Sequence, residues 1–250
     1  MKNLLRRFTA LFRSKKGGPG NSFKASLSSW KHAPLFLSFI FLPLVVSNAQ
    51  PATTQSDPQV YWGGYLDGEH YGQGDAPWET GTIEIFEQHT GKRVSIIHWG
   101  QFWHWDDQSG YPEIGDGYFQ RFETSLFEKV RQRGAIPMVN WNSWSANAGG
   151  SADQPNFRLS KIIDGEYDAY IRQWAKDAKA WGKPLFLRFD HEMNGDWYPW
   201  SERANDNRPG QYVQMWRHVH DIFREVGATN VTWVWSINRV YSDSSSDLAA

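Results

Sequence analysis

Two patterns of hydrophobic and polar positions alternate along the chain after residue 59. Short, nearly continuous apolar runs predict buried strands, and longer stretches with apolar residues three or four positions apart predict amphipathic helices. The strands are expected at residues 60–66, 93–99, 136–141, 185–192 and 231–237. The helices are expected at residues 78–89, 118–133, 164–181 and 209–226, the third beginning at Asp164 as its N-cap.

This alternation predicts the α/β class, with a parallel sheet covered by helices. Short loops precede the strands and long aromatic loops follow them, as in a (β/α)8 TIM barrel, whose active site lies at the carboxyl ends of its strands. A doubly wound sheet would alternate in the same way, but no glycine-rich phosphate-binding turn follows the first strand. The chain supplies about five strands, so we expect either a truncated barrel or an open sheet with exposed edges.

The first part of the chain has a different character. Residues 1–49 combine a basic stretch, an apolar run from Ala33 to Val46, and small residues at Ser47 and Ala49. This order predicts an export signal cleaved near Ala49, or an uncleaved anchor that would be the protein's contact with a membrane. Residues 50–59 then form a linker and residues 60–250 a catalytic barrel, so we expect a secreted or cell-surface protein.

Charge and cysteine content exclude several classes of partner and of catalytic site. The chain has 26 Lys and Arg against 27 Asp and Glu, and eight of the basic residues but none of the acidic ones lie within residues 1–56. The remainder is therefore acidic, which argues against a nucleic-acid partner. Cysteine is absent, so disulfides, metal-thiolate sites and thiol nucleophiles are excluded.

Tryptophan is unusually frequent, with 15 residues. Trp174, Trp181 and Trp233 lie on periodic faces and are expected in the core. Others stand in polar stretches near the ends of strands, where flat rings could stack on a sugar or a nucleobase, and the acidic charge disfavours the nucleobase. This second group comprises Trp99, Trp103, Trp105, Trp141, Trp144, Trp197 and Trp200.

The most informative stretch is the fourth strand and the turn after it, Arg188 to Trp200. Because side chains alternate along a strand, Arg188, Asp190 and Glu192 are expected to share the face toward the barrel axis. Arg188 and Asp190 would pair, since charge at this place needs a partner. Glu192 would open into the cleft among aromatic rings, as general-acid chemistry on a sugar requires, unless it is only the solvent-facing end of a packed strand.

Other chemistries fit less well. His191-Glu192 resembles the start of a zinc-protease helix, but that site needs a second histidine four residues after the first, where Gly195 stands. His218 and His220 are two positions apart on a predicted helix and do not share a face. No G-x-S-x-G elbow of a serine hydrolase is present. We therefore expect neither a metal nor another cofactor.

The run Arg188-x-x-His191-Glu192-Met193-Asn194-Gly195-x-Trp197 resembles the signature of glycoside hydrolase family 26, the β-mannanase family. The resemblance covers residues 60–241. It implies an eight-stranded barrel and retaining hydrolysis of β-1,4-mannan or a related β-glycan, and the open aromatic loops favour endo action. Mixed-linkage β-1,3-1,4-glucan and xylan remain alternative polysaccharide or oligosaccharide substrates.

The same resemblance implies roles for particular residues. Glu192 matches the family's acid/base, and His191 matches the neighbour that orients the carboxylates or contacts sugar. Trp197 matches a platform beside the point of cleavage, and Asn194 is near enough to position the substrate. Trp141 stands where the family places an aromatic residue after the third strand, and His98 and Trp99, after the second strand, are weaker substrate-binding candidates.

One part of the family pattern is not found in these 250 residues. The family's nucleophile is a Glu at the end of strand seven, whereas the predicted strands here number about five. Asp67 and Asp243 follow strands one and five, but neither matches that nucleophile. The alternative to a glycosidase is therefore a non-catalytic β-glycan-binding protein, or a decayed remnant that keeps the aromatic platforms.

Overall fold

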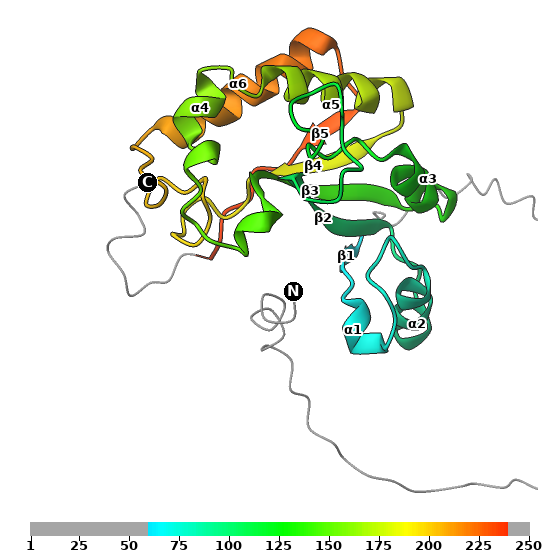
Figure 1. Ribbon diagram of the computed structural model, residues 1–250. Helices are drawn as coiled ribbons and strands as arrows, with labels where there is room; N and C mark the ends of the chain where they lie inside the picture. Colours follow the sequence, from blue (N-terminus) through cyan, green and yellow to red (C-terminus); the bar gives the residue numbers. More distant parts are fainter. Residues whose placement is uncertain (1–59, 240–250) are drawn as a thin grey trace, which may run out of the picture. The chain divides into compact units, whose positions relative to one another are not determined.

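The computed structural model describes residues 60–239. The predicted export signal, the linker and Asp243 lie outside these residues. Within them, five parallel strands form one sheet in the order of the sequence, β1-β2-β3-β4-β5 (Figure 1). The strands are β1 Gly63–Tyr65, β2 Ile96–His104, β3 Ile136–Ser145, β4 Leu185–Phe189 and β5 Val231–Trp233. Sequential parallel order is the arrangement of a (β/α)8 barrel, so the predicted fold class is confirmed.

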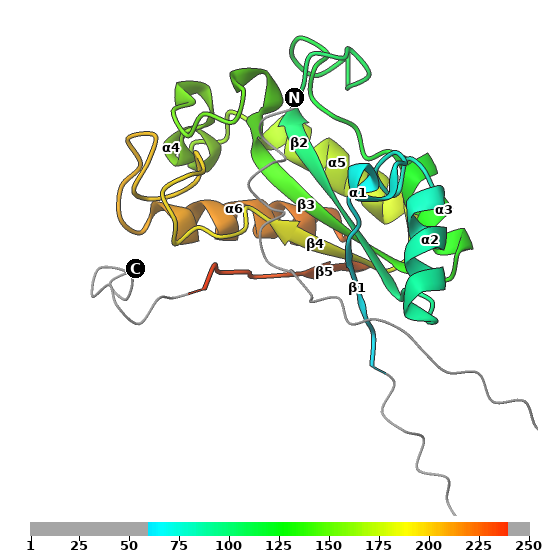
Figure 2. The same cartoon turned by 90° about the horizontal axis from the view of Figure 1, so that it is seen from below.

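Helices connect each strand to the next, and α5 and α6 lie side by side over the sheet (Figures 1 and 2). The longer helices are α2 Gly81–Thr90, α3 Thr124–Gln132, α5 Asp168–Trp181 and α6 Gln211–Val226. The shorter ones are α1 Gly68–Tyr71, α4 Leu159–Ile163 and two 3-10 turns, η2 Ala146–Ala148 and η3 Pro155–Phe157. None of the helices within residues 60–239 combines the length and the apolar character that crossing a bilayer requires.

Side-chain alternation along β4 follows the prediction. Leu185, Leu187 and Phe189 are buried, whereas Phe186 and Arg188 are only partly buried and face the other side. The helix-facing side of the sheet meets a core of packed rings. The Trp141 ring, for example, lies 4.8 Å from that of Trp174 on α5, centroid to centroid. Burial of such large apolar surfaces is the main force that holds helices on a sheet.

Two strands continue past their predicted ends, whereas β1, β5 and the predicted helices are shorter than expected. β2 continues to His104 and β3 to Ser145, past the aromatic segments expected to be loops. The reason is extra backbone pairing, since residues 118–120 lie against the end of β2. Gln120 N donates to Trp103 O (2.8 Å) and Trp105 N donates to Tyr118 O (3.0 Å). This extended segment delays the start of α3 to Thr124.

Local predictions also failed at two element ends. Asp164 does not begin a helix but is the C-cap of α4, and the long helix that follows begins at Asp168 after Tyr167. β4 ends at Phe189, because Asp190 and Glu192 have φ values of +43° and +58°. These left-handed values break the strand alternation on which the expected placement of Asp190 rested.

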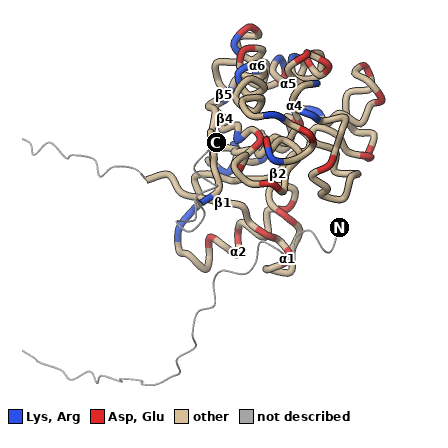
Figure 3. Tube along the Cα trace, turned by 90° about the vertical axis from the view of Figure 1, so that its left-hand side faces the viewer, with Lys and Arg blue, Asp and Glu red and all other residues tan. Residues whose placement is uncertain are grey.

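Charged residues of both signs are spread along the outer helices (Figure 3). Ion pairs join neighbouring elements, as between Arg172 on α5 and Glu225 on α6 (3.0 Å) and between Arg133 and Glu87 (3.1 Å). Each such pair contributes little on its own at the surface. The helices are therefore held mainly by their buried faces.

Candidate active site

Glu192 lies in the turn after β4, at the edge of the sheet where all five parallel strands end. Its side chain is 19% exposed and its backbone N donates to Ser236 O of the segment after β5 (2.7 Å). Its carboxylate has two polar neighbours, Arg188 Nη2 at 3.7 Å and Asn238 Nδ2 at 3.4 Å. The positive φ of Glu192, +58°, costs on the order of 1 kcal/mol, and backbone strain of this kind clusters at functional sites.

Arg188 points along the non-helical side of the sheet and connects three strands. Its guanidinium donates to Asn140 Oδ1 on β3 (3.1 Å) and to Ser236 Oγ after β5 (2.9 Å). Burial lowers the pKa of Arg188, and Glu192 opposes that shift. The expected pair of Arg188 with Asp190 is wrong: the partner of Arg188 is Glu192. A cation held in this way fixes the carboxylate through charge and position.

Asp190 is fully buried on the other side of the turn. Its carboxyl accepts hydrogen bonds from Ser143 N (2.8 Å) and Ser143 Oγ (2.5 Å), and its own O accepts from Tyr212 Oη of α6 (2.7 Å). Burial raises the pKa of Asp190 to about 8, although both bonds from Ser143 act in the opposite direction. Asp190 therefore ties the β3 exit to the β4 exit and does not face the cleft.

His191 is buried beneath the aromatic part of the turn. Its Nε2 lies 3.2 Å from Tyr198 Oη, and its O accepts from Trp200 Nε1 (2.8 Å). Burial, then the charge of Arg188 and then His98, lowers the pKa of His191 to about 3, so the ring is neutral. His191 thus supports the rings that follow it. Burial, and to a smaller extent the nearby Glu192, raises the pKa of the Tyr198 phenol to about 12.

Asn194 acts as a connection between the exits of β4 and β5. Its Oδ1 accepts from Asn238 N (2.8 Å) and its Nδ2 donates to Asn238 O (3.3 Å). Asn238 is also the residue whose amide reaches Glu192. In this structure Asn194 therefore positions a neighbour of Glu192, and its amide is occupied by protein partners.

Trp197 is the exposed platform of the turn. Its side chain is 44% exposed, and the ring packs over Gly195, where a Cβ would lie 2.4 Å from Trp197 Cη2. Tyr198 and Trp200 stack behind it at 4.4 Å between centroids, with an interplanar angle of 17°. A glycine at 195 is thus required for this ring position, and the indole offers a flat face beside Glu192.

Most of the other candidate platforms are core residues. Trp141 and Trp99 are 0% and 1% exposed, so the prediction that they bind substrate is wrong. Trp141 packs under α5 and donates from Nε1 to Tyr170 Oη (3.2 Å), and Trp99 packs against Phe127 of α3. The rings of Trp103 and Trp200 are also fully buried. Of the seven tryptophans expected in platforms, Trp105 and Trp197 are the exposed ones.

His98 lies on the non-helical side of the sheet, in register with Tyr65 of β1. The two rings meet edge to face, with 6.1 Å between centroids. Burial lowers the pKa of His98, against a hydrogen bond with Asn140 that raises it, and Arg188 adds to the lowering. His98 therefore belongs to the polar row that includes Asn140 and Arg188, which leads along the sheet to Glu192.

Sequence reasoning missed four polar partners of this site, Asn140, Ser143, Ser236 and Asn238. Three of them contact Arg188 or Glu192, and Ser143 binds Asp190. A signal for two of them was present, because Ser236 and Asn238 alternate with hydrophobic residues at the end of the fifth apolar run.

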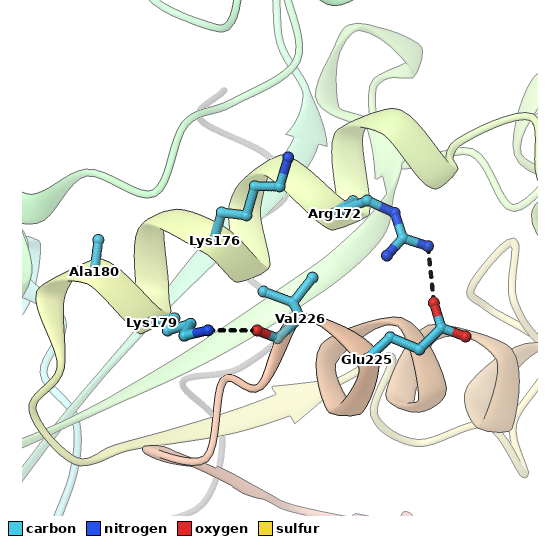
Figure 4. A pocket seen from close by; sticks show the side chains of 6 residues that line it. All are labelled: Arg172, Lys176, Lys179, Ala180, Glu225 and Val226. Atoms are coloured by element: carbon cyan, nitrogen blue, oxygen red, sulfur yellow. Dashed lines mark hydrogen bonds and ion pairs between the residues drawn. The ribbon is translucent and has the colours of Figure 1, made fainter.

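The remaining chemical candidates have structural roles. Asp67 accepts from Glu69 N as the N-cap of α1, and His218 Nε2 lies 2.7 Å from Asp168 Oδ1. Within residues 60–239, no three His, Asp or Glu side chains come together in a group that could hold a metal ion. A groove between α5 and α6 (Figure 4) is lined by Arg172, Lys176, Lys179, Ala180, Glu225 and Val226.

That groove lies at the end of α6, and α6 leads back to the start of β5, so it is remote from the strand exits. Lys179 Nζ donates to Val226 O (2.8 Å), and Arg172 pairs with Glu225 (3.0 Å). Basic side chains at the C-terminus of a helix satisfy its last carbonyl groups. The groove is therefore a helix-packing feature.

Sequence comparisons relate this site to known enzymes. The profile described as Glycosyl hydrolase family 26 matches residues 127–247. Endoglucanase H of Acetivibrio thermocellus is 36% identical over 169 residues, which cover 66% of this chain and 16% of that protein. Beta-1,3-xylanase TXYA of a Vibrio species is 28% identical over 83 residues, 33% of this chain and 16% of that protein. The chain thus spans 16% of the length of each relative.

Two solved structures are also similar. The YdhT protein from Bacillus subtilis has a TM-score of 0.48 and 13% identity, covering 70% of this chain and 57% of that one. A β-mannanase from a symbiotic protist of the termite Reticulitermes speratus, complexed with gluco-manno-oligosaccharide, has a TM-score of 0.46 and 20% identity, covering 65% and 53%. The family match includes the whole exit of β4, with Arg188, Glu192 and Trp197, so this part of the chain is similar to glycosyl hydrolase family 26.

Proposed function

We propose that this chain forms part of a retaining, endo-acting glycoside hydrolase that cleaves a β-linked glycan, with Glu192 as the acid/base. The observation that carries the proposal is the Glu192 carboxylate at the end of β4, with Arg188 at 3.7 Å, Asn238 at 3.4 Å and the exposed Trp197 in the same turn. A positioned carboxyl can protonate the leaving glycosidic oxygen and later activate water. A neighbouring indole supplies the flat apolar face on which a sugar ring stacks.

Retention requires a second carboxylate about 5–5.5 Å from the first, which attacks the anomeric carbon. Asp190 lies in the same turn but does not supply this second carboxylate. It is buried against Ser143 and faces away from the cleft. We assign the nucleophile to a Glu outside the 250 residues. The attack forms a glycosyl-enzyme ester as Glu192 protonates the departing sugar, and water activated by Glu192 then releases the product.

The backbone of the substrate is the next element of the proposal. Mannan is the substrate that the motif resemblance implies. A glucan, the mixed-linkage form included, is the second candidate, since one relative is named Endoglucanase H. Xylan is the third candidate, since another relative is named a β-1,3-xylanase. We further propose that the protein is exported, on the basis of the basic and apolar segment that ends near Ala49.

The test is hydrolysis of mannan, mixed-linkage glucan and xylan by a protein that carries these 250 residues together with the proposed nucleophile, by its Glu192→Gln variant, and by Glu225→Gln as a matched control on α6. We expect the rate at which reducing ends are released from one polymer to fall at least about 100-fold in Glu192→Gln, which is the usual contribution of a general acid. The rate should be unchanged in Glu225→Gln. Hydrolysis that survives Glu192→Gln would overturn the assignment of the acid/base. Binding of a polymer without hydrolysis by the unsubstituted protein that includes the nucleophile would favour the glycan-binding alternative.

A further inference from the structure

A second exposed tryptophan lies on the same edge of the sheet as Trp197. Trp105 is 39% exposed and directly follows β2, whereas Trp197 is 44% exposed and follows β4. Because β2 and β4 are parallel in one sheet, both residues stand at its carboxyl edge, the edge at which barrel enzymes bind substrate. The family signature contains Trp197 but not Trp105, so the role of Trp105 is open.

Packed rings connect these two indoles across the exits of three strands. Trp105 meets Phe102 edge to face at 6.2 Å, and Phe102 meets Trp144 of β3 at 5.5 Å. Trp144 meets Tyr198 at 5.8 Å, and Tyr198 meets Trp197 at 6.3 Å, all between centroids. Phe102 and Tyr198 are themselves partly exposed. We call these five residues the aromatic band.

The Trp105 end of the band is held in place by its neighbours. Trp105 N donates to Tyr118 O (3.0 Å), and Asp106 N donates to Asn147 Oδ1 (3.1 Å). The preceding residue, His104, lies within hydrogen-bond distance of Ser145 Oγ (3.1 Å) and Asp116 Oδ2 (3.0 Å). An exposed ring fixed on both sides loses little conformational freedom when a ligand binds, which favours affinity.

Two buried polar atoms beside the band have no protein partner among the described residues, Asn142 Oδ1 and Trp144 Nε1. Asn142 is the register partner of Phe102, and Trp144 belongs to the band itself. Folded proteins rarely leave buried acceptors and donors unpaired. Both atoms lie beneath the surface of the band, so they belong to its support and offer no direct contact to a ligand.

From this arrangement we propose that Trp105 forms a second sugar-binding position, which holds the same β-glycan chain several units away from the bond that is cleaved. The proposal rests on the proposed function, because the sugar at Trp197 is its reference point. The exposed indoles of Trp105 and Trp197 stand at the two ends of the band, with the partly exposed rings of Phe102 and Tyr198 between them and Trp144 buried beneath. A substrate long enough to reach both indoles would therefore bind more tightly than one that reaches only Trp197.

The test measures binding by titration calorimetry in a Glu192→Gln background, which blocks turnover. The probes are trisaccharides and octasaccharides of mannan and of mixed-linkage β-glucan. We expect Trp105→Ala to weaken binding of an octasaccharide about tenfold, equivalent to about 1.4 kcal/mol, and to leave the trisaccharide unchanged. Trp105→Tyr, which keeps a flat ring, should retain most of the octasaccharide affinity. Trp78→Ala is the control, since Trp78 is an equally exposed indole outside the band.

Each outcome separates the two proposals. If Trp197→Ala weakens both lengths and Trp105→Ala weakens only the longer one, the second position is supported. If Trp105→Ala leaves the affinity for both lengths unchanged while Trp197→Ala lowers it, the second position is overturned and the proposed function stands. If oligosaccharides of mannan, of mixed-linkage glucan and of xylan all fail to bind a correctly folded Glu192→Gln chain, the proposed function is overturned together with the second position. Near-ultraviolet circular dichroism checks folding in every variant.

Discussion

At the scale of single residues, the turn after β4 places two consecutive titratable groups in the interior. Burial raises the pKa of Asp190 to about 8 and lowers the pKa of His191 to about 3. Both groups are therefore neutral near pH 7, although an aspartate and a histidine are charged over much of the acidic range when exposed. Neutral partners at this place leave Arg188 and Glu192 as the charged pair that faces the cleft.

Asp190→Asn tests the protonation of the buried carboxyl. Between pH 3.8 and about 8 the folded state binds a proton that the unfolded state has lost, so the free energy of unfolding falls as the pH rises through this window. The loss is on the order of 5 kcal/mol when complete. Asparagine does not titrate, so the variant should lose this slope. Urea unfolding near pH 5 and near pH 9 measures the difference.

The control is Asp196→Asn, which changes an exposed carboxyl in the same turn and should keep the wild-type slope. An Asp190→Asn variant with the pH dependence of the wild type would show that Asp190 is ionised in the folded protein.

Gly195→Ala tests the position of the Trp197 ring. A Cβ at residue 195 would lie 2.4 Å from Trp197 Cη2 and Cζ2, so the indole must move. We expect the variant to fold but to lose glycan affinity by about tenfold, as Trp197→Ala would. Gly64→Ala is a matched control, because a Cβ there meets nothing within 4 Å. Full affinity in Gly195→Ala would mean that the ring position is not required for binding.

At the scale of elements, the site is assembled from the ends of different strands. β3 contributes Asn140, β4 contributes Arg188, and the segment after β5 contributes Ser236 and Asn238. The turn after β4 is joined to the β5 exit by Glu192 N, which donates to Ser236 O, and by the Asn194 amide. Catalytic groups supported by several rigid strands keep the geometry that chemistry requires.

Asn194→Ala tests the connection between the exits of β4 and β5. The variant loses the bonds to Asn238 N and Asn238 O, and it should lower the free energy of unfolding by about 1–2 kcal/mol. Because Asn238 also contacts Glu192, hydrolysis should fall more than stability predicts. Asn194→Asp keeps the acceptor for Asn238 N and should be less affected. Equal turnover in Asn194→Ala and wild type, measured on the substrate found above, would contradict this role.

At the scale of the whole described unit, the sheet has two strands that pair on one side only. Within residues 60–239, β1 pairs with β2 and β5 pairs with β4, and neither has a second neighbour in the sheet. Large hydrophobic residues are exposed beside both edges, among them Tyr61, Tyr65, Trp235 and Ile237. Unpaired edges with apolar neighbours promote association between chains.

The chain of 250 residues should therefore associate as its concentration rises, and Ile237→Lys should reduce that association. A lysine next to the β5 edge opposes pairing because its charge would have to be desolvated. Sedimentation velocity over a range of concentrations provides the measurement. Val213→Lys, which changes an exposed hydrophobic residue on α6, is the control and should behave as the wild type. Association that is equally strong in Ile237→Lys would exclude the β5 edge as its cause.

The hydrophobic pattern alone determined the class of fold, the side-chain alternation along β4, and the place of Glu192 close after that strand. These features follow from periods of two and 3.6 residues, which are local properties of the chain. Only the tertiary structure decided that Trp141 is core while Trp105 and Trp197 are exposed, and that Asp190 binds Ser143 and not Arg188. Whether a ring is buried, and which group pairs with a charge, depends on residues far away in sequence, such as Tyr170, which packs against Trp141. The local periodicity of the chain does not encode these contacts.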